Sequence, residues 1–188
     1  VIGNTTPKFS GGFGLNATYK GFDMSMFFNF MYDFDVLNAN KIMLTTWADN
    51  KENNFLMNIA SDKRWRNFDD MGNEIRYSPE VLAEFNKNAT MWNPTSIGRP
   101  ICMSYAVEDG SFLRLNSATL GYTLPSVWTK KVGLSKVRFY VSGNNLFTLT
   151  GYSGYDPEVN IATGLTPNID YNRYPRSRTY TFGAQLTF

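Results

Sequence analysis

Histidine is absent from the sequence, and cysteine occurs once, at Cys102. Without histidine the chain cannot build Ser-His-Asp or Cys-His catalytic centres or histidine-ligated metal sites, and one cysteine cannot form an intrachain disulfide or a thiolate cluster. Carboxylate pairs such as Asp69 with Asp70 and Glu108 with Asp109 fall in turn-like sequence, so we interpret them as loop charges. The composition therefore predicts neither an enzyme nor a bound cofactor.

Long apolar runs and excess charge are missing as well. No uncharged stretch approaches the roughly 20 apolar residues of a transmembrane helix. The opening "VIGNTTPKF" lacks the basic start and apolar run of a secretory signal. The formal net charge of +2, without a long basic cluster, argues against nucleic acid as a partner. If the chain contacts a membrane, it must do so with strands.

Aromatic residues and glycine are abundant, with 15 Phe, 11 Tyr and 15 Gly, a composition that favours strands and tight bends. Near 8–20 and 22–33, apolar residues fall on every second position, with mostly polar or small residues between them. Because successive side chains of a strand point to opposite faces, both segments have one apolar face. The residues that we predict to face lipid are Phe9, Phe13, Leu15, Tyr19, Phe22, Met24, Met26, Phe28 and Phe30.

The length of these segments separates a membrane strand from an ordinary one. Strands of globular proteins usually have about 5 to 6 residues, whereas strands that cross an outer membrane need about 9 to 11. From Phe9 to Tyr19 the chain takes ten steps of about 3.3 Å, which at a tilt near 40° climb roughly 25 Å. That is the height of the apolar band of an outer-membrane barrel.

Three further strands are expected near 111–124, 136–149 and 178–188. In the first of them Leu113 and Leu115 are out of phase with the later apolar residues. This predicts a β-bulge at "NS", the two residues that follow Leu115, and "GNN" predicts another irregularity in the second strand.

The connections alternate between short turns and two long loops, 34–110 and 150–177. This is the asymmetry of outer-membrane barrels, which have short periplasmic turns and long outer loops. Within the first loop, "SPEVLAEFNKN" predicts a short helix with Ser78 as its N-cap. Five strands cannot close a barrel, so we expect the chain to be one piece of a larger protein.

Four stretches together resemble a known family. They are "VIGNTTPKFSGGFGLNATYKGFDMSMFFNFMYDFDVLN", "VEDGSFLRLNSATLGYTLP", "LSKVRFYVSGNNLFTLTGYSGYDPEV" and "YPRSRTYTFGAQLTF". In this order they are similar to the C-terminal end of the SusC/RagA family of TonB-dependent outer-membrane transporters. The resemblance covers nearly the whole chain except about 41–104.

The resemblance implies an all-β fold in which residues 1–188 are the last five antiparallel strands of a 22-stranded transmembrane barrel, the size of plugged outer-membrane transporters. The plug domain and the TonB-box of the family are absent from this chain. A family member imports oligosaccharides, or sometimes peptides, through the outer membrane of a Gram-negative bacterium. It works with a SusD-like surface lipoprotein as a lid, and TonB supplies the energy.

The stretch "RTYTFGAQLTF" alternates apolar and small polar residues up to a final aromatic. It resembles the C-terminal signal that the assembly machinery of outer-membrane barrels reads. The residues expected to form this barrel-assembly signal are Tyr180, Phe182, Leu186 and Phe188.

Aromatic residues in the two long loops are candidates for contact with a ligand or with the lipoprotein lid: Trp47, Trp65, Trp92 and Tyr155. Aromatic rings stack on sugars, but they also pack the small core of a loop, and this alternative stays open for each residue. The family signature "GYSGYDPEV" contains Asp156 and Glu158. Calcium ligation by these carboxylates is conceivable, although Asp-Pro usually makes a turn.

A second reading of the whole chain is a soluble all-β carbohydrate-binding or adhesin module that uses its exposed aromatic residues. An outer-membrane enzyme ranks third, because the absence of histidine removes the usual lipase and protease arrangements. The environment of residues such as Phe13, Met24 and Phe182 separates the first two readings. In a barrel they form an open outer band, whereas in a soluble module they meet between two sheets.

Overall fold

The computed structural model describes residues 2–46, 56–59, 63–94, 101–158 and 168–188. The chain divides into two compact units, one formed by Val1–Leu37 with Val107–Phe188 and the other by Asn38–Ala106. In the described part of the chain, no helix has the length and apolar character needed to cross a membrane.

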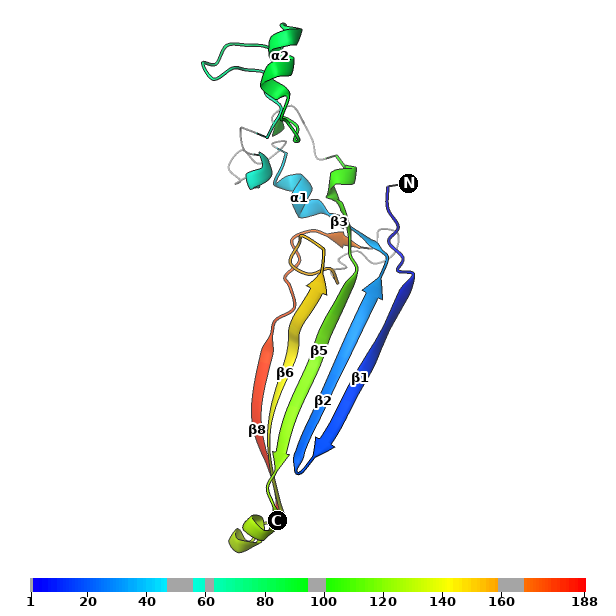
Figure 1. Ribbon diagram of the computed structural model, residues 1–188, viewed down its shortest axis with the longest axis vertical. Helices are drawn as coiled ribbons and strands as arrows, with labels where there is room; N and C mark the ends of the chain where they lie inside the picture. The colour runs from blue at the N-terminus through cyan, green and yellow to red at the C-terminus, as the bar shows by residue number, and fades with distance from the viewer. Residues whose placement is uncertain (1, 47–55, 60–62, 95–100, 159–167) are drawn as a thin grey trace. The chain divides into compact units, whose positions relative to one another are not determined.

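The first unit is built on an antiparallel sheet of five strands in the order β1-β2-β5-β6-β8 (Figure 1). Each strand differs from the range expected from the sequence by at most one residue at either end. The strands are β1 (Phe9–Tyr19), β2 (Phe22–Tyr32), β5 (Phe112–Thr123), β6 (Lys136–Thr150) and β8 (Thr179–Thr187).

Two irregularities interrupt the pairing of the central strands, and both were predicted. The pairing of β5 with β2 shifts between Leu115 and Ser117, so Asn116 is the extra residue of a β-bulge. The pairing of β5 with β6 shifts at the same level, where Asn145 takes a left-handed conformation with φ 52°. The bulge in β5 corrects the phase of Leu113 and Leu115, which pair with Phe30 and Phe28.

Both connections at one end of the sheet are short. β1 and β2 are joined by Lys20 and Gly21, which have positive φ of 46° and 89°, as a two-residue hairpin requires. β5 and β6 are joined by a helical turn, α3 (Ser126–Thr129) with the 3₁₀ turn η4 (Lys130–Val132). Figure 1 shows both turns and the C-terminus at this end, which we call the short-turn end.

At the opposite end a second, three-stranded sheet in the order β4-β3-β7 forms within the segments expected to be loops. Its strands are β3 (Asp35–Asn38), β4 (Val107–Asp109) and β7 (Ile169–Asp170). The hydrophobic core of the unit lies here, where Phe34 and Val36 pack with Phe112 and Tyr152.

The described residues of the second unit form short helices, which are joined by turns and two isolated β-bridges. These helices are α1 (Ala39–Met43), η1 (Met57–Ile59), α2 (Pro79–Asn86) and η3 (Ser104–Ala106). The predicted helix α2 is present with Pro79 in its first turn, but the Ser78 side chain makes no capping hydrogen bond. Asn86 ties α2 to the chain before it, because its side chain accepts from the N–H of Arg66 (2.6 Å) and donates to the Arg66 carbonyl (2.9 Å).

Candidate functional site

An apolar face covers β1 and β2. Their register pairs Phe13 with Phe28 and Leu15 with Met26, so the nine residues predicted to face lipid share one side of the hairpin. The rings of Phe13 and Phe28 stack at a centroid distance of 4.9 Å. Antiparallel pairing of two alternating strands therefore assembles the apolar face from residues that the sequence spaces two apart.

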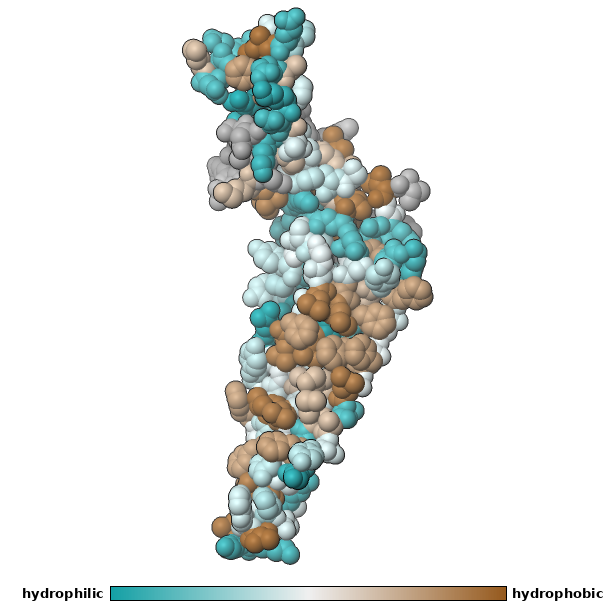
Figure 2. Space-filling model, viewed as in Figure 1, coloured by the Kyte–Doolittle hydropathy of each residue, from teal (hydrophilic) through white to brown (hydrophobic). Residues whose placement is uncertain are grey.

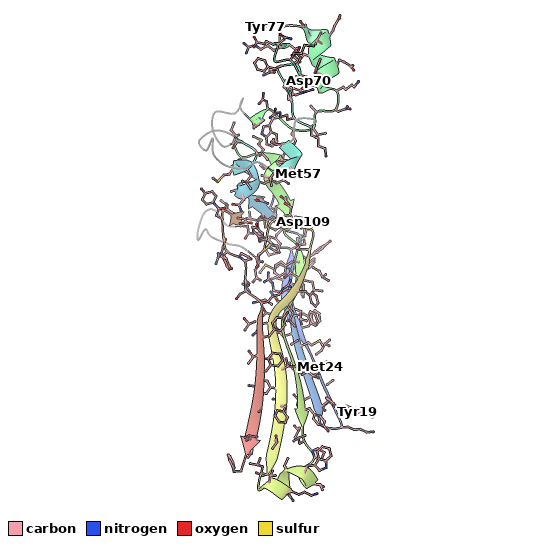
Figure 3. All side chains as sticks on the ribbon, turned by 90° about the vertical axis from the view of Figure 1, so that its left-hand side faces the viewer. Tyr19, Met24, Met57, Asp70, Tyr77 and Asp109 are labelled. Atoms are coloured by element: carbon pink, nitrogen blue, oxygen red, sulfur yellow. The ribbon has the colours of Figure 1, made fainter. Side chains whose placement is uncertain are left out.

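The same face continues across the other strands. Met24 pairs with Leu120 on β5, Leu120 with Val141 on β6, and Val141 with Phe182 on β8. Figure 2 shows hydrophobic side chains gathered over this face, and Figure 3 shows Tyr19 and Met24 on the same side of the sheet. One uninterrupted apolar surface thus spans all five strands.

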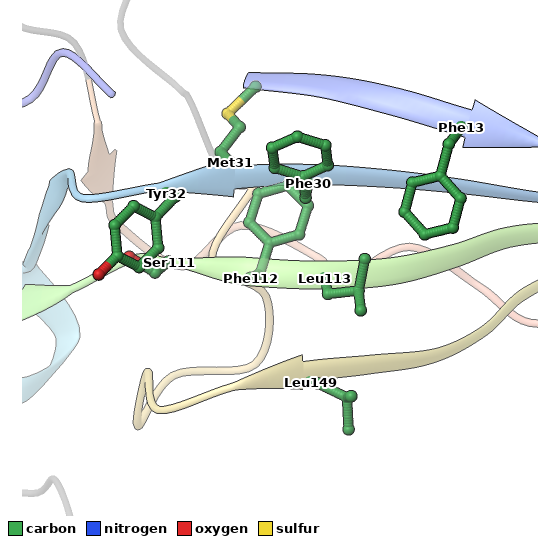
Figure 4. Close-up of a pocket in the computed structure, with 8 residues that line it drawn as sticks. All are labelled: Phe13, Phe30, Met31, Tyr32, Ser111, Phe112, Leu113 and Leu149. Atoms are coloured by element: carbon green, nitrogen blue, oxygen red, sulfur yellow. The ribbon is translucent and has the colours of Figure 1, made fainter. Parts of the chain in front are cut away.

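This surface is open. Phe9 is 65% exposed, Leu15 52% and Phe182 81%, and in the described part of the chain no second sheet covers them. Near the end of the sheet opposite the short turns, which we call the long-loop end, the surface is hollowed between Phe13, Phe30 and Leu149 (Figure 4). A soluble monomer rarely exposes so extended an apolar surface. The arrangement differs from the two facing sheets of a soluble β-module.

The opposite face of the sheet is mostly polar and carries an ion pair between Asp23 on β2 and Arg138 on β6. Arg138 donates through Nε to Asp23 at 2.9 Å and through a second nitrogen to the other carboxylate oxygen. Gly121 on β5 lies between them, and a Cβ there would meet a carboxylate oxygen of Asp23 at 2.6 Å. Glycine therefore leaves the space through which the pair reaches across the strand.

Phe27 is an aromatic exception on this mostly polar face, where it pairs with Gly14 and Ser117 and is 43% exposed. A Cβ on Gly12 would lie 2.8 Å from the end of the Phe27 ring, so the glycine provides the flat surface against which the aromatic side chain lies. Neither the ion pair nor this aromatic contact was singled out by the sequence analysis.

A buried charge cluster fixes the segment after β6 to the polar face of β5. The Arg114 side chain is 3% exposed, bonds the Asp156 carboxylate, and lies 3.5 Å from the Glu158 carboxylate. Arg176 donates to Glu158 from the other side at 2.8 Å. Guanidinium groups thus already contact both carboxylates that were considered as calcium ligands, Asp156 and Glu158. Arg114 was missed because its only signal is a single charge within "FLRLN".

Two opposing effects act on the Asp156 carboxyl. Burial alone would raise its pKa, but hydrogen bonds from Arg114 and from the backbone N–H of Glu158 (2.9 Å) favour the charged form, and the pKa is lowered overall. Close by in the chain, the Tyr152 hydroxyl donates to Asp170 at 2.7 Å, and burial together with this bond raises the pKa of Tyr152. The segment "GYSGYDPE" is therefore held by buried polar contacts at two points.

The loop aromatics predicted to contact a ligand or lid lie in different units. Trp92 packs edge-on against Tyr105 at 5.1 Å and donates its indole N–H to the Thr45 carbonyl at 3.0 Å, as the core-packing alternative expects. Trp65 is 39% exposed in the same unit, whereas Tyr155 is 86% exposed in the first unit. Trp47 lies outside the described residues.

Replacing Asp156 by asparagine should loosen the segment 152–158. The substitution leaves Arg114 buried with only the more distant Glu158 as a charged partner, a change that costs about 3–5 kcal/mol for buried pairs. We expect faster amide hydrogen exchange in this segment at pH 7, measured by mass spectrometry on the full-length protein. Asp70→Asn is the matched control, because that carboxylate is 79% exposed beside Arg66 and should change exchange little.

The pH dependence of the stabilisation by Asp156 follows from the direction in which its pKa is shifted. Because the pKa of Asp156 is lower in the folded state, its contribution is complete above the ordinary aspartate value near 4 and is lost as the pH falls below it. The exchange difference between wild type and Asp156→Asn should therefore shrink when the pH is lowered below about 4. A difference that stays constant down to pH 2 would contradict this role.

The chain is similar to proteins of one kind along its whole length. It is 34% identical over 194 residues to the TonB-dependent receptor P3 of Formosa agariphila, an alignment that covers all of this chain and 17% of that receptor. Over 88 residues, 45% of this chain and 8% of the relative, it is 38% identical to the TonB-dependent receptor SusC of Bacteroides thetaiotaomicron. No family model matches the sequence.

Comparison with solved structures points to the same kind of protein. The structure of the RagAB peptide transporter matches with a TM-score of 0.72 and 26% identity, and the match covers 98% of this chain and 18% of the solved chain. The "closed-closed" state of the RagAB peptide importer matches with a TM-score of 0.71 and 25% identity. The chain spans less than a fifth of the length of each of these proteins. Similarity of sequence over the full chain and of fold over nearly all of it agree, and the chain belongs to the SusC/RagA family of TonB-dependent receptors.

Proposed function

We propose that this chain forms the last five strands of a 22-stranded outer-membrane barrel that imports oligosaccharides or peptides. The observation that carries the proposal is the apolar face that runs uninterrupted over five long strands. Lipid can cover such a face without a partner protein, while the polar face turns to the lumen of the barrel.

Strand length supports this placement. β1 and β2 each have 11 residues and β6 has 15, so each is long enough to cross the apolar layer of the membrane, which takes about 9 to 11 tilted residues. The polar groups on the opposite face, including Asn16 and the Asp23–Arg138 pair, would then meet water or the plug domain. In this orientation the short-turn end faces the periplasm and the long loops face the exterior.

The partners follow from the family. SusC and RagAB are similar to this chain, and RagAB is a peptide importer. We therefore infer a SusD-like lipoprotein as the lid and TonB as the energy source, which would act through a part of the protein outside this chain. Of the four aromatic residues predicted to contact a lid or a ligand, Tyr155, exposed beside the buried Asp156, and Trp65 are the described ones with exposed side chains.

The proposal is tested on the full-length receptor expressed in its own host. We expect it to fractionate with the outer membrane, to copurify with a surface lipoprotein, and to support growth on an oligosaccharide or peptide source in a TonB-dependent manner. Recovery of the receptor from the soluble fraction would contradict the proposal. Outer-membrane location without a lipoprotein would contradict the inferred partner alone.

Arginine substitutions on the two faces of β1 should differ in their effect on the yield of folded receptor. Leu15→Arg places a charge on the apolar face near the middle of the strand, where arginine costs about 2–4 kcal/mol in outer-membrane barrels. Asn16→Arg, the matched control, places the same charge one residue away on the polar face. We expect a lower yield of folded receptor, measured by heat-modifiable mobility in gels, for Leu15→Arg only. Equal yields for the two variants would show that lipid does not cover the apolar face.

Substitution of the final aromatic should reduce membrane insertion. Phe188 is 90% exposed, so Phe188→Ser removes little packing, and any loss of inserted receptor would reflect recognition by the assembly machinery. Tyr174→Ser is the control, because this aromatic residue is similarly exposed but precedes β8. The measurement is the amount of receptor in the outer-membrane fraction, and an unchanged amount for Phe188→Ser would remove the proposed signal role.

A further inference from the structure

Charge is distributed unevenly along the first unit. Its eight carboxylate residues include seven in or beside the connections at the long-loop end, and Asp23 alone lies near the short-turn end. Four lysines lie at the short-turn end, in the two turns and at the start of β6. These lysines, which we call the cationic rim, are Lys20, Lys130, Lys131 and Lys136.

The cationic rim is not neutralised by the protein. All four lysines are exposed, and none forms an ion pair within the described residues. Asp23, the one acidic side chain near this end among the described residues, forms its ion pair with Arg138, and Lys136 acts on it only through space. Lys20 lies over the Tyr19 ring at 5.2 Å, a contact that leaves its charge available to an anion.

The turn that carries two of these lysines also exposes apolar side chains. Val127 is 68% exposed, Trp128 60% and Val132 70%. The backbone of the turn is nonetheless well fixed, because Thr129 is buried and its carbonyl accepts from the N–H of Leu134 at 3.1 Å. The exposure of three large apolar groups is therefore a property of an ordered turn.

This turn adjoins the apolar face. It begins four residues after Tyr122 of β5, whose ring packs at 4.4 Å against Phe22, one of the residues that end the apolar face. Figure 3 shows the turn below the strands. Tryptophan with lysine at the edge of an apolar band is the composition found where a protein meets the headgroups of a bilayer, because one end of each side chain is apolar and the other is polar.

We propose that the α3–η4 turn and the cationic rim form a binding site for anionic phospholipid in the membrane leaflet that faces the periplasm. Trp128 and the two valines would lie at the level of the headgroups and upper acyl chains, and the lysines would contact lipid phosphates. The inference rests on the proposed function for the presence of a bilayer. A lipid occupant fits better than an acidic protein, because the exposed apolar groups continue the surface that lipid covers.

The test uses full-length receptor, purified in mild detergent with an equal mixture of phosphatidylglycerol and phosphatidylethanolamine. Native mass spectrometry counts the retained lipids of each kind. For the variant K130Q/K131Q we expect the ratio of phosphatidylglycerol to phosphatidylethanolamine to fall by up to about 25-fold, since each of the two lysines near an anionic surface contributes about a factor of five. Trp128→Ser should lower the number of both lipids and leave their ratio unchanged.

The control is K63Q/K87Q, which removes two exposed lysines from the second unit. An equal fall of the ratio in this control would overturn the site, since net charge alone would then explain the preference. An unchanged ratio in K130Q/K131Q would also overturn it, and loss of import in that variant would then indicate a protein partner at the turn. Both outcomes differ from failure of the proposed function, in which the receptor does not fractionate with the outer membrane.

Discussion

The cross-strand register of the five-stranded sheet is the constraint on which the rest of the unit depends. Because side chains alternate from face to face, a shift by one residue would move every apolar group of a strand to the polar side. The extra residue Asn116 is what keeps both halves of β5 in phase with β2, placing Leu113 beside Phe30 and Leu120 beside Met24. One residue inserted into one strand thus decides whether the apolar face is whole.

On the polar face the requirement concerns charge, because a charged side chain buried there needs a partner of opposite charge. Arg114 and Arg138 both meet this requirement with carboxylates, one from the segment after β6 and the other from β2. The first pair is buried and the second is partly open. These two pairs explain how the strands accommodate arginine among apolar and small residues. Burial of an arginine without a partner would cost far more free energy than burial of a paired one.

Elements governed by local periodicity were predictable, and those governed by distant partners were not. Alternation located the five strands, and the break in its phase located the bulge at Asn116 before any pairing was known. The burial of Arg114 could not be predicted, because its partner Asp156 lies 42 residues further along the chain. The short strands β3, β4 and β7 were missed for a related reason, since segments of two to four residues carry too little periodicity to stand out.

The pairing of β3 with β4 has a consequence for how the chain tolerates change. Leu37 and Val107, which flank the second unit, lie opposite one another in that pair. The ends of the intervening segment are therefore held together by the first unit, whatever lies between them. Lengthening a connection whose ends are already joined adds little entropy cost and leaves the pairing of β2 with β5 undisturbed. The segment between Leu37 and Val107 should accordingly tolerate insertion, shortening or replacement while the five-stranded sheet stays intact.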